Sequence, residues 1–365
     1  MREYALVFLV AAAVTYLLTP LSRRFAVKVG AMAKPRDRDV HAIPTPRMGG
    51  LAMYGGVLAS LLVAAHLPVL RTVAQTYDEP RSIAIAGGVI VLLGAVDDRF
   101  QLDALTKLAG QIMAAGAMTL LGVRLASVVL PGMHGDIVLT PDVGVPLTVL
   151  LAVVLVNAIN FIDGLDGLAA GVVGIAAAAS FTFSYSLSAN HQLLRAQPAT
   201  LIAAILAGVC VGFLPHNFNP ARQFMGDSGS MLIGLLLAAT VTSVTGEVSY
   251  GGIAGAARLP SLIPLFVPLL VLAVPFVDLL LAVVRRTRAR RSPFSPDKMH
   301  LHHRLLEIGH SHVRAVLLLW FWAALLGFGG VIAQFSSAPL TIVLIVTGLA
   351  GLSLVLVRMP GRAGR

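Results

Sequence analysis

Long apolar stretches recur along almost the whole chain, and short segments between them carry the polar and charged residues. An α-helix needs about 20 predominantly apolar residues to cross a bilayer. The pattern predicts about eleven membrane helices, at approximately 4–21, 48–70, 82–96, 105–122, 146–161, 166–187, 200–213, 228–246, 262–284, 314–335 and 338–357. The third and seventh are short for a membrane span, so we expect both to extend into their flanks.

One segment between the fourth and fifth predicted helices departs from this pattern. From Leu125 to Pro146 apolar and polar residues alternate weakly, and Pro131-Gly132 and Pro141-Asp142 interrupt the segment. Alternation bounded by turn residues favours a short pair of strands. We therefore predict an all-α integral membrane fold with one small extracytoplasmic hairpin.

Composition agrees with lipid as the main solvent. The chain has 365 residues, of which 57% are hydrophobic and 12% are charged, whereas soluble domains carry about 25% charged residues. No polar segment is long enough for a soluble domain, so we predict one membrane domain at 1–357 and a short basic tail at 358–365. The single cysteine, Cys210, excludes an internal disulfide.

The net charge of +10 does not indicate nucleic-acid binding, because the basic residues lie in short loops between apolar spans. Cytoplasmic loops of membrane proteins carry an excess of Lys and Arg. Of the 27 Lys and Arg residues, 21 fall after odd-numbered helices or in the tail. This bias predicts an extracytoplasmic N-terminus and a cytoplasmic C-terminus.

Most of the informative acidic residues also follow odd-numbered helices. They are Asp97, Asp98 and Asp103 after the third, Asp163 and Asp166 after the fifth, and Asp227 after the seventh. A basic, histidine-rich segment follows the ninth. Segments that are far apart in sequence thus meet at one membrane face, which favours an enzyme over a transporter, whose ionisable groups lie mid-span.

Four motifs carry this chemistry. The first is the Asp97-Asp98 pair with Lys107 a few turns later; adjacent carboxylates repel unless a cation faces them, and Mg²⁺ takes oxygen ligands of this kind. The second places Asn157, Asn160, Asp163 and Asp166 at every third position, followed by glycines that allow close backbone approach. Polar groups at the end of an apolar helix are costly unless they are satisfied.

The third motif runs from Pro215 to Ser230 and contains Asn217, Phe224 and Asp227. Asp227 or Ser228 is suited to cap the helix that follows, and such a helix N-terminus also favours phosphate.

The fourth motif contains His300, His302, His303 and Arg304. Their spacing does not match ordinary zinc motifs and fits donors around a diphosphate better. A basic loop from Lys34 to Arg47 adds further candidate phosphate contacts.

In this order the motifs resemble the polyprenyl-phosphate N-acetylhexosamine-1-phosphate transferase family, over roughly residues 34 to 312. The His-Leu-His-His form resembles the branch that uses UDP-GlcNAc and undecaprenyl or decaprenyl phosphate (the WecA and TagO types). The resemblance implies transfer of GlcNAc-1-phosphate from UDP-GlcNAc to a polyprenyl phosphate at the cytoplasmic face of the plasma membrane, with release of UMP. It also implies Mg²⁺, for which Mn²⁺ can substitute, and leaves a homodimer open.

The resemblance implies roles for individual residues. Metal binding falls to Asp227, Asn160 and Asp98. Catalysis falls to Asp97, Asp98, Asp163 and His302. Substrate binding falls to Lys107, Asn157, Asp166, Asn217, Phe224, His300, His303 and Arg304. Two alternatives stay open, namely the phospho-MurNAc-pentapeptide transferase of peptidoglycan synthesis and, from a different class, a polytopic transporter. Direct attack by the acceptor phosphate and a covalent phospho-aspartate route are both allowed, and we favour the first.

Overall fold

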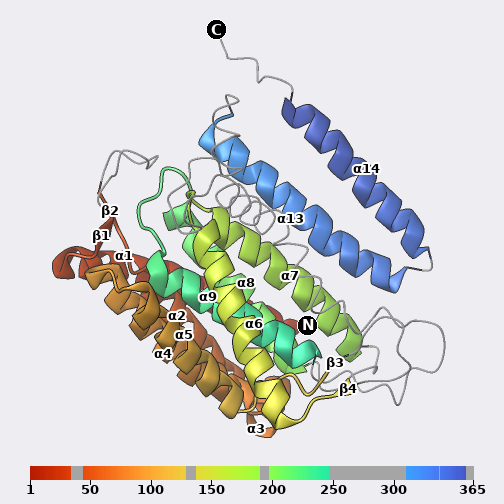
Figure 1. Ribbon diagram of the computed structural model, residues 1–365, viewed down its shortest axis with the longest axis horizontal. Helices are drawn as coiled ribbons and strands as arrows, with labels where there is room; N and C mark the ends of the chain where they lie inside the picture. The colour runs from red at the N-terminus through yellow and green to blue at the C-terminus, as the bar shows by residue number, and fades with distance from the viewer. Residues whose placement is uncertain (34–43, 129–136, 190–196, 246–309, 337, 359–365) are drawn as a thin grey trace.

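A computed structural model describes residues 1–33, 44–128, 137–189, 197–245, 310–336 and 338–358 (Figure 1). Within these ranges the chain is a bundle of α-helices with two short antiparallel strand pairs. The predicted all-α fold is confirmed. The predicted helix at 262–284 lies outside the described residues.

The described helices are α1 (Arg2–Val29), α2 (Gly49–Ala64), α3 (Pro68–Thr76), α4 (Glu79–Phe100), α5 (Ala104–Leu120), α6 (Pro141–Ile162), α7 (Leu168–Ala189), α8 (Gln197–Asn217), α9 (Gly226–Thr245), α13 (His312–Phe335) and α14 (Pro339–Arg358). The third and seventh predicted helices correspond to α4 and α8. Both extend into their flanks, as predicted.

The strands form two separate pairs. β1 (Met32–Ala33) pairs with β2 (Thr45–Pro46), and β3 (Ser127–Val128) pairs with β4 (Ile137–Val138). The second pair lies between α5 and α6, so the predicted hairpin is confirmed at that place in the chain.

Several helices are suited to span a bilayer. In the described part of the chain α1, α6, α7, α8, α9 and α13 are long and apolar enough, and α2 with α3 makes a seventh if the pair is one broken span. The predicted spans at 82–96, 105–122 and 338–357 correspond to α4, α5 and α14, which are not among these. The protein is a multi-pass membrane protein.

The predicted helix at 48–70 is wrong in one respect, because it is broken. The axes of α2 and α3 differ by 106°. Leu67 between them has an extended backbone (φ −84°, ψ 137°), as expected for the residue before a proline, here Pro68, since the proline ring disfavours helical geometry there. The Glu3 carboxylate of α1 then accepts hydrogen bonds from two backbone N–H groups in the first turn of α3.

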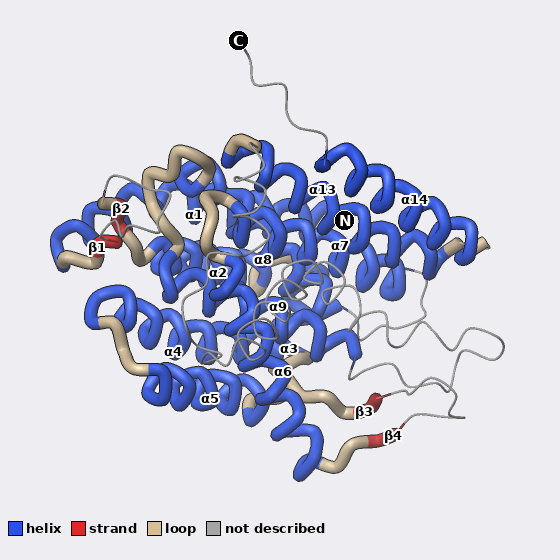
Figure 2. Tube along the Cα trace, turned by 45° about the horizontal axis from the view of Figure 1, so that its top comes forward, coloured by secondary structure: helices blue, strands red, loops and turns tan. Residues whose placement is uncertain are grey.

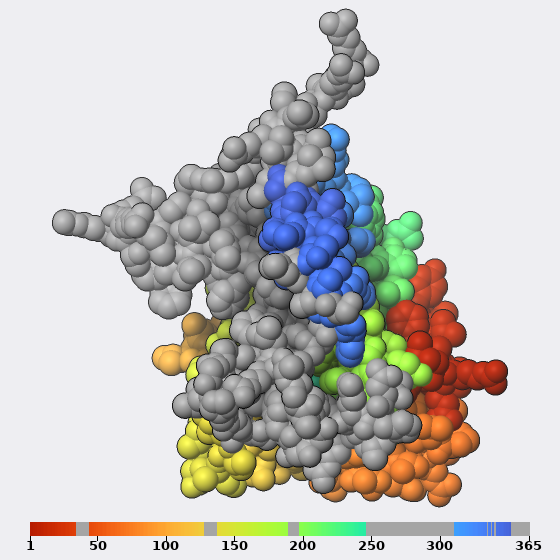
Figure 3. Space-filling model, turned by 90° about the vertical axis from the view of Figure 1, so that its right-hand side faces the viewer, coloured from red at the N-terminus to blue at the C-terminus, as the bar shows by residue number. Residues whose placement is uncertain are grey.

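The centre of the bundle is α9. It packs against α2, α4, α6, α7 and α8, and its whole apolar segment is buried. Figure 2 shows α9 between α8 and α6 in the middle of the molecule. α13 packs against α7, with α14 beside it (Figure 1), and α14 forms part of the outer surface (Figure 3). Residues at the start of α9 are thus held from several sides.

Two glycines allow the closest of these contacts. A Cβ atom at Gly50 of α2 or at Gly94 of α4 would overlap the backbone of Ser228 in the first turn of α9. The absence of side chains at both positions therefore sets how closely α2 and α4 approach the start of α9.

Replacing Gly94 by alanine should destabilise the protein, because the added methyl group meets backbone that cannot rotate away. We expect Gly94→Ala to lower the free energy of unfolding by about 1–3 kcal/mol, seen as a lower melting temperature in detergent. Gly116→Ala is the matched control, since a Cβ there has nothing within 4 Å. Equal melting temperatures for the two variants would contradict the close contact.

Candidate active site

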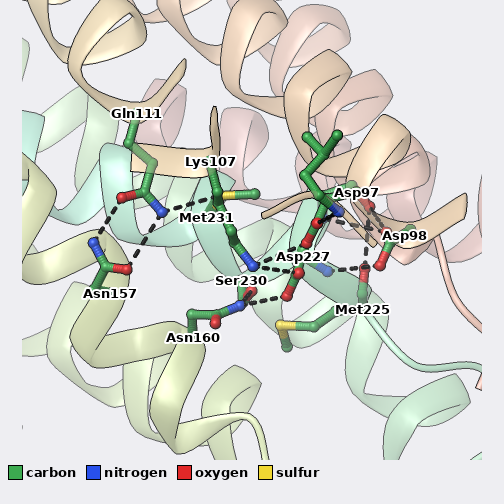
Figure 4. A network of polar contacts seen from close by, with 12 residues as sticks. Asp97, Asp98, Lys107, Gln111, Asn157, Asn160, Met225, Asp227, Ser230 and Met231 are labelled. Atoms are coloured by element: carbon green, nitrogen blue, oxygen red, sulfur yellow. Dashed lines mark hydrogen bonds and ion pairs between the residues drawn. The ribbon is translucent and has the colours of Figure 1, made fainter. Parts of the chain in front are cut away.

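The ends of several helices meet at the start of α9 (Figure 4). Asp97 and Asp98 come from the last turn of α4, which continues to Phe100 and ends at Gln101 in a left-handed conformation. The predicted bounds 82–96 leave both aspartates just beyond the helix, and the expected extension into its flank brings them into its last turn. Both side chains are buried, so their charges need partners within the protein.

A single ammonium group joins two of the carboxylates. Lys107 of α5 donates from Nζ to Oδ2 of Asp97 at 2.9 Å and to Oδ2 of Asp227 at 2.5 Å. Carboxylates that converge in this way would repel each other without a cation between them, and hydrogen bonds between charged partners are among the stronger ones in proteins. Asp97 of α4, Lys107 of α5 and Asp227 of α9 therefore form one charged cluster, although they come from different sequence motifs.

The other oxygen of Asp227 faces α6. Asn160 donates from Nδ2 to Oδ1 of Asp227 at 2.5 Å and to Oγ of Ser230 at 2.8 Å. The predicted metal-site residues Asn160 and Asp227 are thus in direct contact.

Asp98 was predicted as a metal ligand; in this structure it contacts the start of α9, and its role toward a metal stays a prediction. Its Oδ1 accepts from the backbone N–H of Asp227 at 2.9 Å, and its Oδ2 accepts from the N–H and the hydroxyl of Ser228 at 3.3 and 2.8 Å. A carboxylate that accepts the first N–H groups of a helix caps it and complements its dipole. The prediction that Asp227 or Ser228 caps α9 is therefore wrong, because a residue of α4 supplies the cap.

A pair of amides lies one turn deeper than the charged cluster. Asn157 donates from Nδ2 to Oε1 of Gln111 at 2.7 Å, and Gln111 donates from Nε2 to Oδ1 of Asn157 at 3.4 Å. Gln111 lies one helical turn after Lys107, and Asn157 lies one turn before Asn160, so the pair aligns α5 with α6. Asn157 was predicted to bind substrate; in this structure it binds Gln111, and its role toward substrate stays a prediction.

Asp163 ends α6 beside the cluster. Burial, together with the negative charges of Asp227 and Asp98, raises the pKa of Asp163 to about 8. Burial disfavours the charged form of a carboxyl group, and neighbouring carboxylates add to this effect. Asp163 can therefore hold a proton near neutral pH.

Asp166, in the turn before α7, and Asn217, the last residue of α8, are both buried. Oδ2 of Asp166 accepts from Asn219 Nδ2 and from the N–H of Ala221, both at 3.0 Å. Oδ1 of Asn217 accepts from the N–H of Gly167 at 3.1 Å. The structure shows both residues joining the turn before α7 to the segment after α8, and their predicted contact with uridine stays a prediction.

Phe224 is only partly buried and lies beside the segment that precedes α2. Its N–H donates to the carbonyl oxygen of Pro46 at 2.9 Å, and the neighbouring Gln223 donates to the carbonyl oxygen of Arg47 at 3.2 Å. The end of the predicted basic loop is thus fixed next to Phe224. Four predicted residues, His300, His302, His303 and Arg304, lie outside the described residues.

The chain is similar in sequence to known enzymes. A family model described as glycosyl transferase family 4 matches residues 81–245. The chain is 49% identical over 333 residues to the decaprenyl-phosphate N-acetylglucosaminephosphotransferase of Mycolicibacterium smegmatis, covering 90% of this chain and 82% of that protein. The chain belongs to glycosyl transferase family 4.

More distant relatives also match along most of their length. The probable undecaprenyl-phosphate N-acetylglucosaminyl 1-phosphate transferase of Bacillus subtilis is 33% identical over 349 residues, which are 94% of this chain and 89% of that protein. A relative from Salmonella typhi, named undecaprenyl-phosphate alpha-N-acetylglucosaminyl 1-phosphate transferase, is 30% identical over 320 residues, which are 87% of this chain and 80% of that protein. The family resemblance inferred from the motifs is confirmed, including its branch.

Sequence reasoning missed some residues of the family 4 site. Gln111 could have been found, because it is a polar residue one turn after Lys107 in an otherwise apolar helix. The partners of Asp98 and Asp166 could not, because no local pattern shows which distant backbone N–H group a carboxylate will accept.

We expect Asp98→Ala to destabilise the protein by about 1–3 kcal/mol, because two backbone N–H groups and one hydroxyl lose their acceptor. The measurement is the melting temperature in detergent. Asp142→Ala, at an exposed position in the first turn of α6, should change stability by less than about 0.5 kcal/mol. If Asp98→Ala melts like the wild type, the cap does not hold α9.

Asp163 should make the stability of the metal-free protein depend on pH. A carboxyl group with a raised pKa in the folded state takes up a proton on folding. The free energy of unfolding therefore falls as pH rises from about 4, the unfolded pKa, to about 8, the folded pKa. The melting temperature of Asp163→Asn minus that of the wild type should therefore increase between pH 5 and pH 8.

Asp103→Asn is the control for this pH series. Hydrogen bonds from the side chain and the backbone N–H of Thr106 lower the pKa of Asp103, so its contribution to stability is already complete above its unfolded pKa. The difference for Asp103→Asn should stay constant from pH 5 to pH 8. A constant difference for Asp163→Asn as well would contradict the raised pKa.

Proposed function

We propose that the protein transfers GlcNAc-1-phosphate from UDP-GlcNAc to a polyprenyl phosphate, releasing UMP and leaving a polyprenyl-diphospho-GlcNAc in the membrane. The observation that carries this is the cluster of Asp97, Lys107, Asn160 and Asp227 at one end of the helix bundle. Relatives that are 49% and 33% identical are named for N-acetylglucosamine phosphate transfer to decaprenyl and undecaprenyl phosphate. These names favour UDP-GlcNAc over UDP-MurNAc-pentapeptide.

The donor set of the cluster fits Mg²⁺. Oδ2 atoms of Asp97 and Asp227 converge on one cation, the Lys107 ammonium, and a hard divalent ion takes oxygen ligands of this type. Asp227 and Asn160 would hold the ion, with Mn²⁺ as a substitute, while Asp98 would fix Asp227 from behind. When bound, Mg²⁺ would neutralise part of the negative charge on the donor's diphosphate.

The residues of the chain have distinct tasks in this proposal. Lys107 can move between the carboxylates and a donor phosphate, because its side chain is flexible and only partly buried. Asp163 can exchange a proton near neutral pH with the acceptor phosphate. Phosphoryl transfer needs mainly positioning and charge neutralisation, and the rigid start of α9 supplies the positioning. The acceptor phosphate attacks the sugar-bearing phosphorus directly, and UMP leaves.

The proposal places this end of the bundle at the cytoplasmic face of the plasma membrane, with the N-terminus outside, the C-terminus inside and about eleven spans in all. Support comes from the excess of Lys and Arg in loops after odd-numbered helices. The helix ends that carry the cluster are C-terminal for α4 and α6 and N-terminal for α5 and α9, as expected for alternating spans whose ends meet on one side.

The test is release of UMP from UDP-GlcNAc by membranes that contain the protein and a polyprenyl phosphate. We expect turnover that requires Mg²⁺ and stops with a chelator. Asp227→Asn should lower the rate by roughly 100-fold or more while the protein still inserts, and Asp142→Asn should keep it. Normal turnover by Asp227→Asn would refute the assignment, and competition by UDP-MurNAc-pentapeptide would indicate the alternative donor.

A further inference from the structure

The turn between α6 and α7 is held through two successive backbone N–H groups. The N–H of Asp166 donates to Nε2 of His312 at 3.1 Å, and the N–H of Gly167 donates to Oδ1 of Asn217 at 3.1 Å. Both N–H groups precede the first residue of α7, so no carbonyl of that helix accepts from them. Because a buried N–H without an acceptor is costly, these two side chains fix the conformation of the turn.

His312 is far from the turn in sequence and belongs to another helix. It is the first residue of α13, which Ser311 caps by accepting from the N–H of Arg314. To accept the hydrogen bond from the N–H of Asp166, Nε2 of His312 must carry no proton, so the contact requires the tautomer whose hydrogen is on Nδ1.

A second contact fixes α13 against the same region. The ring of Trp320, two turns after His312, occupies the space next to Gly171 of α7, where any Cβ would overlap it. The Trp320 and Phe218 ring centres are 5.8 Å apart. α13 is therefore anchored both to α7 and to the segment after α8.

We propose that His312 is a positioning residue for the nucleotide-sugar side of the active site. By accepting from the N–H of Asp166 it holds the turn that carries Asp163 and Asp166 at a fixed distance from the carboxylate cluster. This proposal rests on the proposed function, because it gives the turn a role in binding the donor. A turn that is already held in its binding conformation pays less ordering cost when the donor binds, so loosening it should weaken donor binding.

Two substitutions separate the hydrogen bond from the shape of the side chain. His312→Phe keeps a flat ring and removes the acceptor, whereas His312→Gln places a carbonyl oxygen near the position of Nε2. We expect His312→Phe to raise KM for UDP-GlcNAc roughly five- to tenfold, as for the loss of one hydrogen bond, with kcat changed by less than about twofold. His312→Gln should restore KM to near the wild-type value.

A measurement without substrate tests the contact itself. Hydrogen–deuterium exchange of the peptide that contains Asp166 should become faster in His312→Phe, because the N–H of Asp166 loses its acceptor. Exchange should return toward the wild-type rate in His312→Gln, where a carbonyl oxygen replaces that acceptor. His66→Phe is the control, since His66 is exposed just after the end of α2 and its Nδ1 hydrogen-bonds to the carbonyl oxygen of Leu62. Neither KM nor exchange near Asp166 should change in that variant.

The outcomes are distinct. Unchanged exchange and unchanged KM in His312→Phe would overturn the proposal, as would a fall in kcat without a rise in KM. Failure of His312→Gln to restore either quantity would show that the ring, rather than its acceptor, matters. If wild-type protein does not turn over UDP-GlcNAc, the proposed function fails, while the exchange measurement still tests the contact between His312 and the turn.

Discussion

Three buried or partly buried carboxylates share one end of a bundle whose interior is otherwise apolar, and the arrangement depends on how their charge is balanced. Lys107 neutralises part of the charge on Asp97 and Asp227. Asp98 is balanced by the first backbone N–H groups of α9. Unpaired charges in such surroundings are strongly destabilising. One lysine and one helix terminus leave the cluster formally negative, which fits the divalent cation of the proposed function.

Close helix packing fixes the positions of these charged groups. Gly50 and Gly94 bring α2 and α4 against the backbone of Ser228, and a Cβ at Gly226 would overlap the Asp98 carboxylate. Gly226 also has a φ of +68°, a conformation that glycine adopts without the strain that a side chain would add. Close backbone contact thus fixes the direction of the first turn of α9, and with it the position of Asp227. The positions of the charged groups are well defined because the apolar helices around them are tightly packed.

Much of the fold follows from hydropathy, and less of the site does. The positions of the described helices and the β3–β4 hairpin were predictable, because apolar length and turn residues are local signals. The convergence of Asp97, Asp163 and Asp227 was predictable from the alternation of helix directions. The break at Leu67 was missed although Pro68 marks it, because the apolar residues on both sides together have the length of a single span. The roles of Asp98 and His312 depend on distant backbone N–H groups, which appear only when α4, α9 and α13 are placed in space.

The separation of the charged residues along the chain has a consequence for biogenesis. Lys107 follows Asp97 by ten residues, so α4 and α5 form a hairpin that contains its own ion pair. Asp227 follows Lys107 by 120 residues and reaches the cluster only after α9 has been synthesised. Within the α4–α5 hairpin Asp97 therefore has its counter-ion before α9 is synthesised. Asp98, by contrast, finds its hydrogen-bond partners only when the first turn of α9 packs against α4.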